Sequence, residues 1–427
     1  MRFISIANHK TGQSVEVPID TLPARALVPE PLPTQGIEVE LPLFDAHTMA
    51  PAPAPMVLQL FGQDSWRTPE TPAHCCEVKT EPHRAAGELL SEYRARAGWL
   101  CRWAESRGLL VVPLATDPMV TLCAVNPSGF IRQLTDCKYG IATMAVNHSM
   151  CTQVNTHVAD GDALLALYQG LIRIAPVLAG MFANSPFSSG RRAGVLSYRH
   201  VVRRVFLNGG DPEHLPRSLH WEAYLKSHQA LTAMGTWFPV LFALNGVIRL
   251  RPDRMCVESG VTDLIAEPRH LAGLLELSRR AAYRILCAYR DGDSLPWWFG
   301  PDDEAVRDAA FRVSMLSAVK LGSKGLCCTS ELRPAPIGEV FAALLSWVGE
   351  AGIPDDPSLP WSQAEAGLRD LLDHGSPAER LMRTLGELHR DCQDPVTGCP
   401  GCPAHIVEVC RRHGRAFHAQ LSDGPAA

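Results

Sequence analysis

The chain has 427 residues, of which 46% are hydrophobic and 20% charged, and 40 Lys and Arg residues against 45 Asp and Glu residues give a formal net charge of −5. The apolar fraction is too high for a disordered chain and is sufficient for one large or two medium domains. The small negative charge argues against a general nucleic-acid binder, which needs an excess of cations against phosphate.

The N-terminus and the cysteines indicate the compartment. Residues 1–20 contain no apolar segment followed by a small-residue cleavage site, so we expect no secretory signal. The longest uncharged stretch, 229–248, contains proline and glycine and is better explained by a buried hairpin or helix than by a membrane span. Fourteen cysteines without a signal peptide favour reduced thiols. We therefore expect a cytoplasmic protein without nucleic-acid or membrane partners, and a homodimer is an option that the sequence leaves open.

Strands and helices alternate along the predicted chain. The first 35 residues are proline-rich and are expected to form an extended arm or a loose leader. The period of the apolar residues, together with Gly, Pro and capping signals, predicts the elements that follow. In the first half they are a strand at 36–45, a loop at 50–55, a strand at 74–80, a helix at 83–107, strands at 109–115 and 149–158, and a helix at 160–184. In the second half they are strand candidates within 194–205 and 247–263, a helix at 269–290, and mainly helices over the last hundred residues, with loops at 353–360 and 394–403. This order predicts an α+β protein whose sheet has a polar, concave face.

Two predicted strands carry carboxylates on one face. Glu38 and Glu40 are two positions apart, so both side chains project to the same side. Like charges repel unless a cation neutralises them, and Mg²⁺ prefers oxygen ligands, so the pair could bind Mg²⁺. A solvated strand face explains this pair alone at least as well. Glu77, Lys79 and Glu81 repeat the pattern. Two such strands side by side would form an acidic cradle for a divalent metal and nucleotide phosphates, although an exposed strand also explains Glu81.

A third strand and a following loop add polar groups. Gln153, Asn155 and His157 occupy alternate positions, and three polar residues on one face of an otherwise apolar strand favour a lined cavity. Asn184 lies at the end of the long helix, in the segment ANSPF. Arg199, in LSYR, could clamp a carboxylate or a phosphate with its planar guanidinium. The alternative is a helix end followed by a surface loop.

These segments resemble the glutamate–cysteine ligases of the plant and proteobacterial type and the related bacterial carboxylate–amine ligases. The matching segments appear in the family's order, over about residues 36–286, and they are GIEVELPLFD, CEVKTEP, TQVNTHV, FANSPF, GVLSYR and RPDRMCVESGVTD. The resemblance implies a glutamine-synthetase-like fold, in which a curved, mostly antiparallel sheet has helices packed on one face, with a helical C-terminal part. It divides the chain into an N-terminal arm (1–35), a ligase-like catalytic domain (36–385) and a Cys/His-rich tail (386–427).

The resemblance also implies an activity on small amino-acid substrates. ATP and Mg²⁺ would support phosphorylation of the γ-carboxylate of glutamate, or of a similar acid, and an amine, cysteine by default, would then attack the acyl phosphate. By resemblance, the metal ligands are Glu38, Glu40, Glu77, His157 and Glu258, the catalytic residues are Gln153, Asn155 and Arg199, and the nucleotide contacts are Asn184 and Arg251.

The sequence departs from the family at Gly260, where an Arg usually follows the acidic residue by two positions. Loss of that Arg leaves the acceptor amine open, and Arg249, Arg251 and Arg254 are near enough in sequence to replace it. One alternative is a non-catalytic binding or scaffold protein that keeps the fold. Another is phosphotransfer to a guanidino or amino group, for which the sequence offers no specific motif.

The tail poses a separate question. A Cys-x-x-Cys pair with further Cys and His residues can close a tetrahedral zinc site. Thiols that pack a terminal helix, or a redox pair, explain the same residues more simply. The candidate zinc ligands are Cys392, Cys399, Cys402 and Cys410. The adjacent pairs Cys75–Cys76 and Cys327–Cys328 are interpreted as core thiols.

Overall fold

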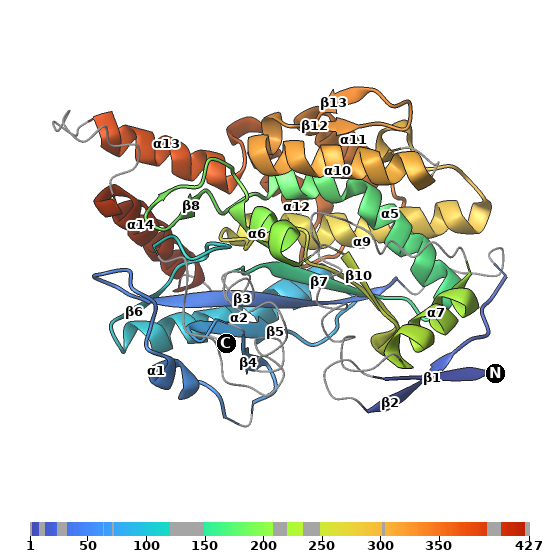
Figure 1. Cartoon of the computed structure of the whole chain (residues 1–427), viewed down its shortest axis with the longest axis horizontal. Helices are drawn as coiled ribbons and strands as arrows, with labels where there is room; N and C mark the ends of the chain where they lie inside the picture. The colour runs from blue at the N-terminus through green and yellow to red at the C-terminus, as the bar shows by residue number, and fades with distance from the viewer. Residues whose placement is uncertain are drawn as a thin grey trace.

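The computed structural model of the chain describes residues 2–7, 13–23, 32–62, 64–70, 72–119, 149–207, 220–233, 248–300, 304–390 and 403–422. A seven-stranded sheet crosses the middle of the molecule (Figure 1), and its path runs β10-β11-β7-β3-β5-β4, with β6 paired to β3. Every pairing in this sheet is antiparallel. The strands are β3 (Thr34–Asp45), β4 (Arg67–Pro69), β5 (Cys75–Lys79), β6 (Leu109–Val111), β7 (Thr152–His157), β10 (Ile248–Arg251) and β11 (Cys256–Ser259).

The long central strand β3 has two different faces. Ile37, Val39 and Leu41 are completely buried in the main hydrophobic core. Glu38 and Glu40 alternate with them and project to the opposite side, as the two-residue period of a strand requires. The sheet therefore has an apolar face and a polar face, and the polar face contains the residues of interest.

Helices cover the apolar face in two layers. The inner layer contacts the sheet and consists of α2 (Ala86–Glu105), α5 (Gly161–Met181) and α9 (Pro268–Asp291). Val154 and Ile248 of the sheet line a small internal cavity together with Leu171 of α5 and Leu277 of α9. The outer layer consists of α10 (Glu304–Leu321), α11 (Ile337–Gly349) and α12 (Trp361–His374). Helices α10 and α11 lie above α5 in Figure 1, and α12 packs against α9. The predicted α+β fold, with helices on one face of an antiparallel sheet, is confirmed.

Helix α5 shows why composition alone is a poor guide to burial. Asp160 caps it, because its side chain accepts a hydrogen bond from the backbone N–H of Ala163 at 2.9 Å, as the sequence predicts. The helix is long and apolar enough to cross a membrane, but 83% of its most apolar window is buried inside the protein. Its apolar surface is thus used by the core.

Two predictions differ from the structure. Strand candidates were expected within 194–205, but α6 (Tyr198–Leu207) is a helix, because its valines follow the helical spacing rather than strict alternation.

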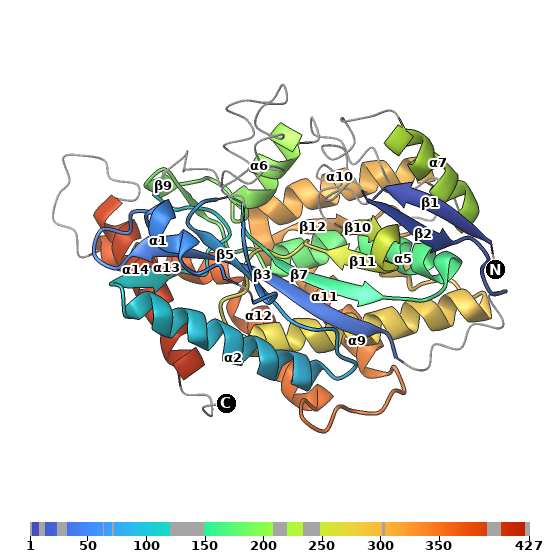
Figure 2. The same ribbon diagram turned by 90° about the horizontal axis from the view of Figure 1, so that it is seen from below.

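The proline-rich arm was expected to be extended or loose, but β1 (Phe3–Ala7) and β2 (Ser14–Pro18) form an antiparallel hairpin. The hairpin packs beside α7 (Trp221–Ala233) at one end of the molecule (Figure 2), and the Trp221 indole donates to the carbonyl of Pro18 at 2.9 Å.

Other short elements complete the described chain. They are α1 (Ala54–Leu58), β8 (Phe187–Ser188), β9 (Arg191–Arg192), β12 (Leu326–Cys328), β13 (Pro334–Pro336), and the 3-10 turns η2 (Pro252–Arg254), η3 (Trp297–Phe299) and η4 (Gly322–Lys324). Of the stretch 229–248, residues 234–247 lie outside the described residues.

Helix α13 (Pro377–Arg390) ends within the tail, and helix α14 (Pro403–Ser422) lies entirely in it. Cys410 is buried in an apolar cluster with Ile406 and Val409, and burial raises the pKa of its thiol. The other proposed zinc ligands, Cys392, Cys399 and Cys402, lie outside the described residues. The environment of Cys410 is that of a core thiol, so the described part of the tail gives zinc no support.

Candidate active site

The register of the sheet gathers most of the predicted site residues on the polar face. Carboxylates and amides from β3, β5, β7 and β11 lie in rows across neighbouring strands. The opposed pairs are Glu40 with Glu77, Glu38 with Gln153, and Asn155 with Glu258. Residues distant in sequence are thus brought together as the predicted cradle requires.

Three carboxylates form a tight acidic cluster. Oxygens of Glu40, Glu70 and Glu77 all lie within 4.8 Å of one another, and Glu40 and Glu77 are 7% and 3% exposed. Glu70 was missed by the sequence analysis, because it lies in an irregular loop after β4 and has no periodic pattern to mark it. Glu70 lies five residues before β5 in the sequence, and nothing but its proximity to Glu77 could have marked it.

Hydrogen bonds hold two of these carboxylates in place. Glu40 accepts the backbone N–H of Cys151 at 2.7 Å and the amide of Gln153 at 2.8 Å, one on each oxygen. Glu77 accepts the hydroxyl of Thr68 at 2.7 Å and pairs with Lys79, also at 2.7 Å. Burial lowers the pKa of Lys79, but the negative charges around it outweigh burial and raise it, so Lys79 stays cationic.

The donor set fits a divalent cation. The side-chain oxygens Oε1 of Gln153 and Oδ1 of Asn155 are buried and have no hydrogen-bond partner among the residues that the structure describes. Buried polar atoms without partners are rare and call for an explanation. Carboxylate and amide oxygens are the ligands that Mg²⁺ prefers, and a cation would also relieve the repulsion within the acidic cluster.

Three arginines of the β10–β11 hairpin border this face. Glu258 is paired with Arg249 and with Arg251, the latter at 2.9 Å, and Arg251 also contacts Asp253 at 3.2 Å. Arg254 lies 3.5 Å from Glu38. Glu258 is therefore neutralised by arginine here, and Arg251, predicted to contact nucleotide, is engaged with two carboxylates.

Arg199 lies beneath the polar face rather than on an open surface. It is fully buried, and its guanidinium donates to the carbonyls of Gly260 at 2.7 Å and Thr262 at 3.2 Å. Asp263 lies 3.7 Å away. Arg199 thus anchors the segment that follows β11.

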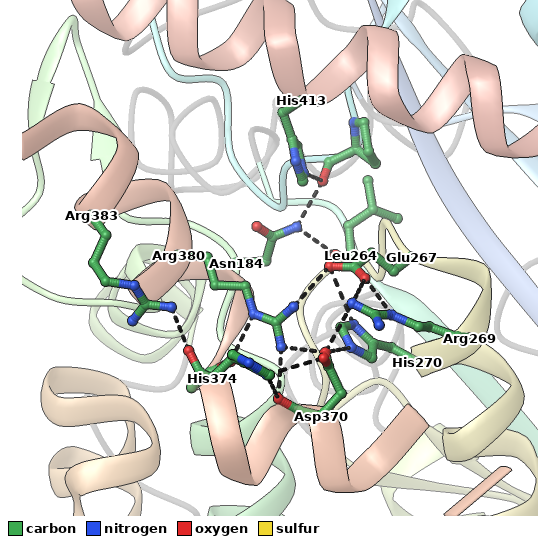
Figure 3. A network of polar contacts seen from close by, with 12 residues as sticks. Asn184, Leu264, Glu267, Arg269, His270, Asp370, His374, Arg380, Arg383 and His413 are labelled. Carbon is green, nitrogen blue, oxygen red and sulfur yellow. Dashed lines mark hydrogen bonds and ion pairs between the residues drawn. The ribbon is translucent and has the colours of Figure 1, made fainter. Parts of the chain in front are cut away.

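Two further predicted residues are placed differently. His157 is exposed, and the partial burial of its imidazole lowers its pKa. Asn184 is buried, and its amide donates to the carbonyls of Pro113 at 2.7 Å and Leu264 at 2.8 Å (Figure 3). The structure gives Asn184 a role in joining three segments behind the sheet.

Figure 3 also shows a second group of possible metal ligands, Glu267, His270 and Asp370. Arg269 and Arg380 already supply cations to it, because they lie 3.0 and 2.5 Å from Asp370. Burial opposes ionisation of Asp370, but hydrogen bonds from Arg380 and His270 outweigh burial and lower its pKa to about 2. This network joins α9, α12 and α13 and needs no metal.

The fold has counterparts among solved ligases. The glutamate–cysteine ligase of Francisella tularensis, solved in complex with AMP, superposes with a TM-score of 0.58 at 14% identity, over 92% of this chain and 91% of that chain. A bifunctional glutathione synthetase from Pasteurella multocida gives the same TM-score at 14% identity, over 92% of this chain and 54% of that one. These likenesses show that the chain has a glutamine-synthetase-like fold.

Sequence comparison narrows this class to one family. The profile of glutamate–cysteine ligase family 2 (GCS2) matches residues 34–397, and the chain belongs to this family. Among its relatives, the Rhodococcus jostii protein named "Putative glutamate--cysteine ligase 2-1" is 25% identical over 354 residues, which is 81% of this chain and 90% of the relative. A Saccharopolyspora erythraea protein, "Putative glutamate--cysteine ligase 2-2", is 26% identical over 371 residues, or 83% and 89%. The resemblance stated from the sequence motifs is confirmed.

Proposed function

We propose that this protein is an ATP- and Mg²⁺-dependent carboxylate–amine ligase that activates the γ-carboxylate of glutamate, or of a similar acid, as an acyl phosphate and couples it to an amine such as cysteine. The observation that supports this most is the convergence of Glu40, Glu70 and Glu77. On the same face of the sheet, Oε1 of Gln153 and Oδ1 of Asn155 are buried without a hydrogen-bond partner among the residues that the structure describes. The names of the family relatives and the AMP complex of the Francisella ligase point in the same direction.

The polar face contains residues suited to each part of this chemistry. Glu38, Glu40, Glu70 and Glu77, with the amide oxygens of Gln153 and Asn155, would hold Mg²⁺, which offsets phosphate charge when bound. The backbone N–H of Cys151 and the amide of Gln153 fix the orientation of Glu40. Preorganised charges of this kind lower the barrier because they need not reorient during the reaction.

Positive side chains on the same face would bind the anionic groups. Lys79 lies beside Glu77, and the half-exposed Arg254 lies beside Glu38. Arg254 is held only weakly, at 3.5 Å, so its planar guanidinium is available to a phosphate or carboxylate oxygen. These residues are the candidates for replacing the family Arg that is absent at Gly260.

A second function, a non-catalytic binding or scaffold protein, is favoured by one observation. Both oxygens of Glu258, a predicted metal ligand, are engaged by Arg249 and Arg251. A carboxylate neutralised in this way has no need of a metal. Glu40, in contrast, is oriented by hydrogen bonds from the Cys151 N–H and the Gln153 amide. The family match over residues 34–397 makes the ligase our first choice.

The test is ADP release from Mg²⁺–ATP and L-glutamate, with and without a panel of amines. Release that depends on the amine, and that stops when EDTA removes Mg²⁺, supports ligation. Phosphorylation of a stable product without amine dependence supports a kinase. ATP binding without turnover supports the scaffold function. We also propose that the acceptor is an amine such as cysteine and that the protein acts in the cytoplasm. The division into an N-terminal arm, a catalytic domain and a tail is part of the same proposal.

A further inference from the structure

Glu258 of β11 faces two arginines of the neighbouring strand β10. The register places Arg249 directly opposite Glu258, and it places Arg251 opposite Cys256, two positions further along. Cross-strand side chains that are directly opposed, or two positions apart on the same face, are within reach of one another. The pairing of these strands therefore brings two positive charges to one carboxylate.

Both oxygens of Glu258 take part in these contacts. Nη1 of Arg251 donates to Oε2 at 2.9 Å, and Arg249 pairs with Oε1. The Glu258 side chain is only 3% exposed, so the protein itself compensates a buried charge here, as buried carboxylates require. A metal ion that used Glu258 as a ligand would have to displace at least one of the two guanidinium groups.

The buried arginine is fixed in its position. The Arg251 side chain is 3% exposed, and its Nε and Nη2 donate to the two oxygens of Asp253, each at 3.2 Å. The turn that follows begins at Pro252 and ends at Met255, and the carbonyl of Met255 accepts the N–H of Val158 at 3.0 Å. Displacing the Arg251 side chain would break buried ion pairs, which is strongly destabilising.

The acidic cluster on the same face of the sheet differs in its charges. Oxygens of Glu40, Glu70 and Glu77 lie within 4.8 Å of one another. Glu40 is oriented by two neutral N–H groups, and Glu77 pairs with the ammonium of Lys79. A divalent ion would relieve the repulsion among these carboxylates, whereas at the β10–β11 hairpin it would meet two guanidinium groups.

We propose that Arg249 and Arg251 take the place of a metal ion at Glu258, and that the protein binds divalent metal at the acidic cluster and not at Glu258. This arrangement departs from the ligand set that the resemblance to the family implies, in which Glu258 binds metal. A guanidinium keeps its charge at every physiological pH and belongs to the chain, so this part of the face stays neutralised without an ion. The inference rests on the proposed ligase function, because it concerns the ions of that site.

The test counts the Mn²⁺ ions that bind to the full-length protein without nucleotide, from the electron paramagnetic resonance signal of the free ion. Mn²⁺ prefers the same oxygen ligands as Mg²⁺. The variants are Glu258→Gln, Glu40→Gln and a double variant that carries Arg249→Gln and Arg251→Gln. Arg254→Gln, on the same turn, is the matched control for loss of a positive charge, because Arg254 pairs with a different carboxylate. Melting temperatures show which variants are folded.

We expect Glu258→Gln to bind Mn²⁺ with the stoichiometry and affinity of the wild type. Glu40→Gln should weaken binding by more than tenfold, since even changes outside the ligands themselves typically cost 10- to 100-fold in metal affinity. The double arginine variant should bind one ion more than the wild type, because the Glu258 carboxylate is then open to metal. Arg254→Gln should keep the number of ions of the wild type. If the double variant unfolds, Glu258→Gln decides the question by itself.

Two results would overturn the inference and leave the proposed function standing, provided that the wild type releases ADP in the presence of an amine. One is a Mn²⁺ affinity that falls in Glu258→Gln as far as in Glu40→Gln, because Glu258 would then be a ligand. The other is a folded double variant that gains no ion, because the arginines would then not be what keeps metal away. Absence of both Mn²⁺ binding and turnover in the wild type would overturn the proposed function as well.

Discussion

Replacing Glu40 by Gln tests the acidic cluster most directly. The substitution keeps the size of the side chain and removes one negative charge from the group of Glu40, Glu70 and Glu77. If this cluster binds Mg²⁺, turnover should fall to background, because a metal ligand is lost while core packing is unchanged. Glu81→Gln, at an exposed position after β5, provides a matched control and should behave as the wild type does.

The expected effect on stability follows from the distances. Carboxylate oxygens within 4.8 Å repel by about 3 kcal/mol per pair at an effective dielectric constant of about 20. Against this relief, the variant weakens two hydrogen bonds to a charged acceptor, each worth about 1.5–3 kcal/mol. Without metal, the relief of two such pairs, about 6 kcal/mol, is at least as large as the roughly 3–6 kcal/mol of hydrogen bonding at stake, so the free energy of unfolding should not fall and should rise by at most about 3 kcal/mol.

Mg²⁺ should stabilise the wild type against unfolding but not the Glu40→Gln variant. A ligand present at about 100 times its dissociation constant stabilises the folded state by about 2.7 kcal/mol, and only the wild type and Glu81→Gln should gain this. Urea unfolding is measured with Mg²⁺ and with EDTA, beside ADP release. A Glu40→Gln variant that keeps both its turnover and its Mg²⁺ stabilisation would refute the assignment of this cluster as the metal site.

Three further predictions concern residues around the site. Arg199→Lys replaces a fork that reaches two carbonyls, so it should lower the free energy of unfolding by about 2 kcal/mol in urea and raise the KM for the carboxylate substrate; unchanged values for both would refute its placement. Asn184→Ala leaves the carbonyls of Pro113 and Leu264 without their donor and should cost about 2–4 kcal/mol of stability by the same measurement, whereas an unaffected urea midpoint would contradict it. Nε2 of His418 accepts the N–H of Val111 at 3.0 Å, which only a neutral ring can do, and burial lowers its pKa. Its contribution to stability should therefore be complete above about pH 6.5 and be lost as the pH falls toward the lowered folded pKa; His418→Gln should flatten the change in urea midpoint between pH 7.5 and pH 5, and an equal slope would argue against this role.

Alternation and helical period were sufficient to predict the elements that build the site. Glu38 and Glu40 must share a face of any strand, and so must Gln153 and Asn155, because side chains alternate at a period of two. The motifs around them also identified the family, which the profile match confirms. The fold class and the polar face of the sheet could thus be predicted from local patterns.

Only the tertiary structure decided which of these residues meet. Glu70 joins the acidic cluster from an irregular loop, and Arg199 is buried beneath Gly260 instead of projecting from a surface loop. Residues 198–207 form the helix α6 where the sequence suggested a strand. The spacing of apolar and polar residues along the sequence predicts the face on which a side chain lies. The distances between segments depend on strand order and register, which are set by packing across the whole chain.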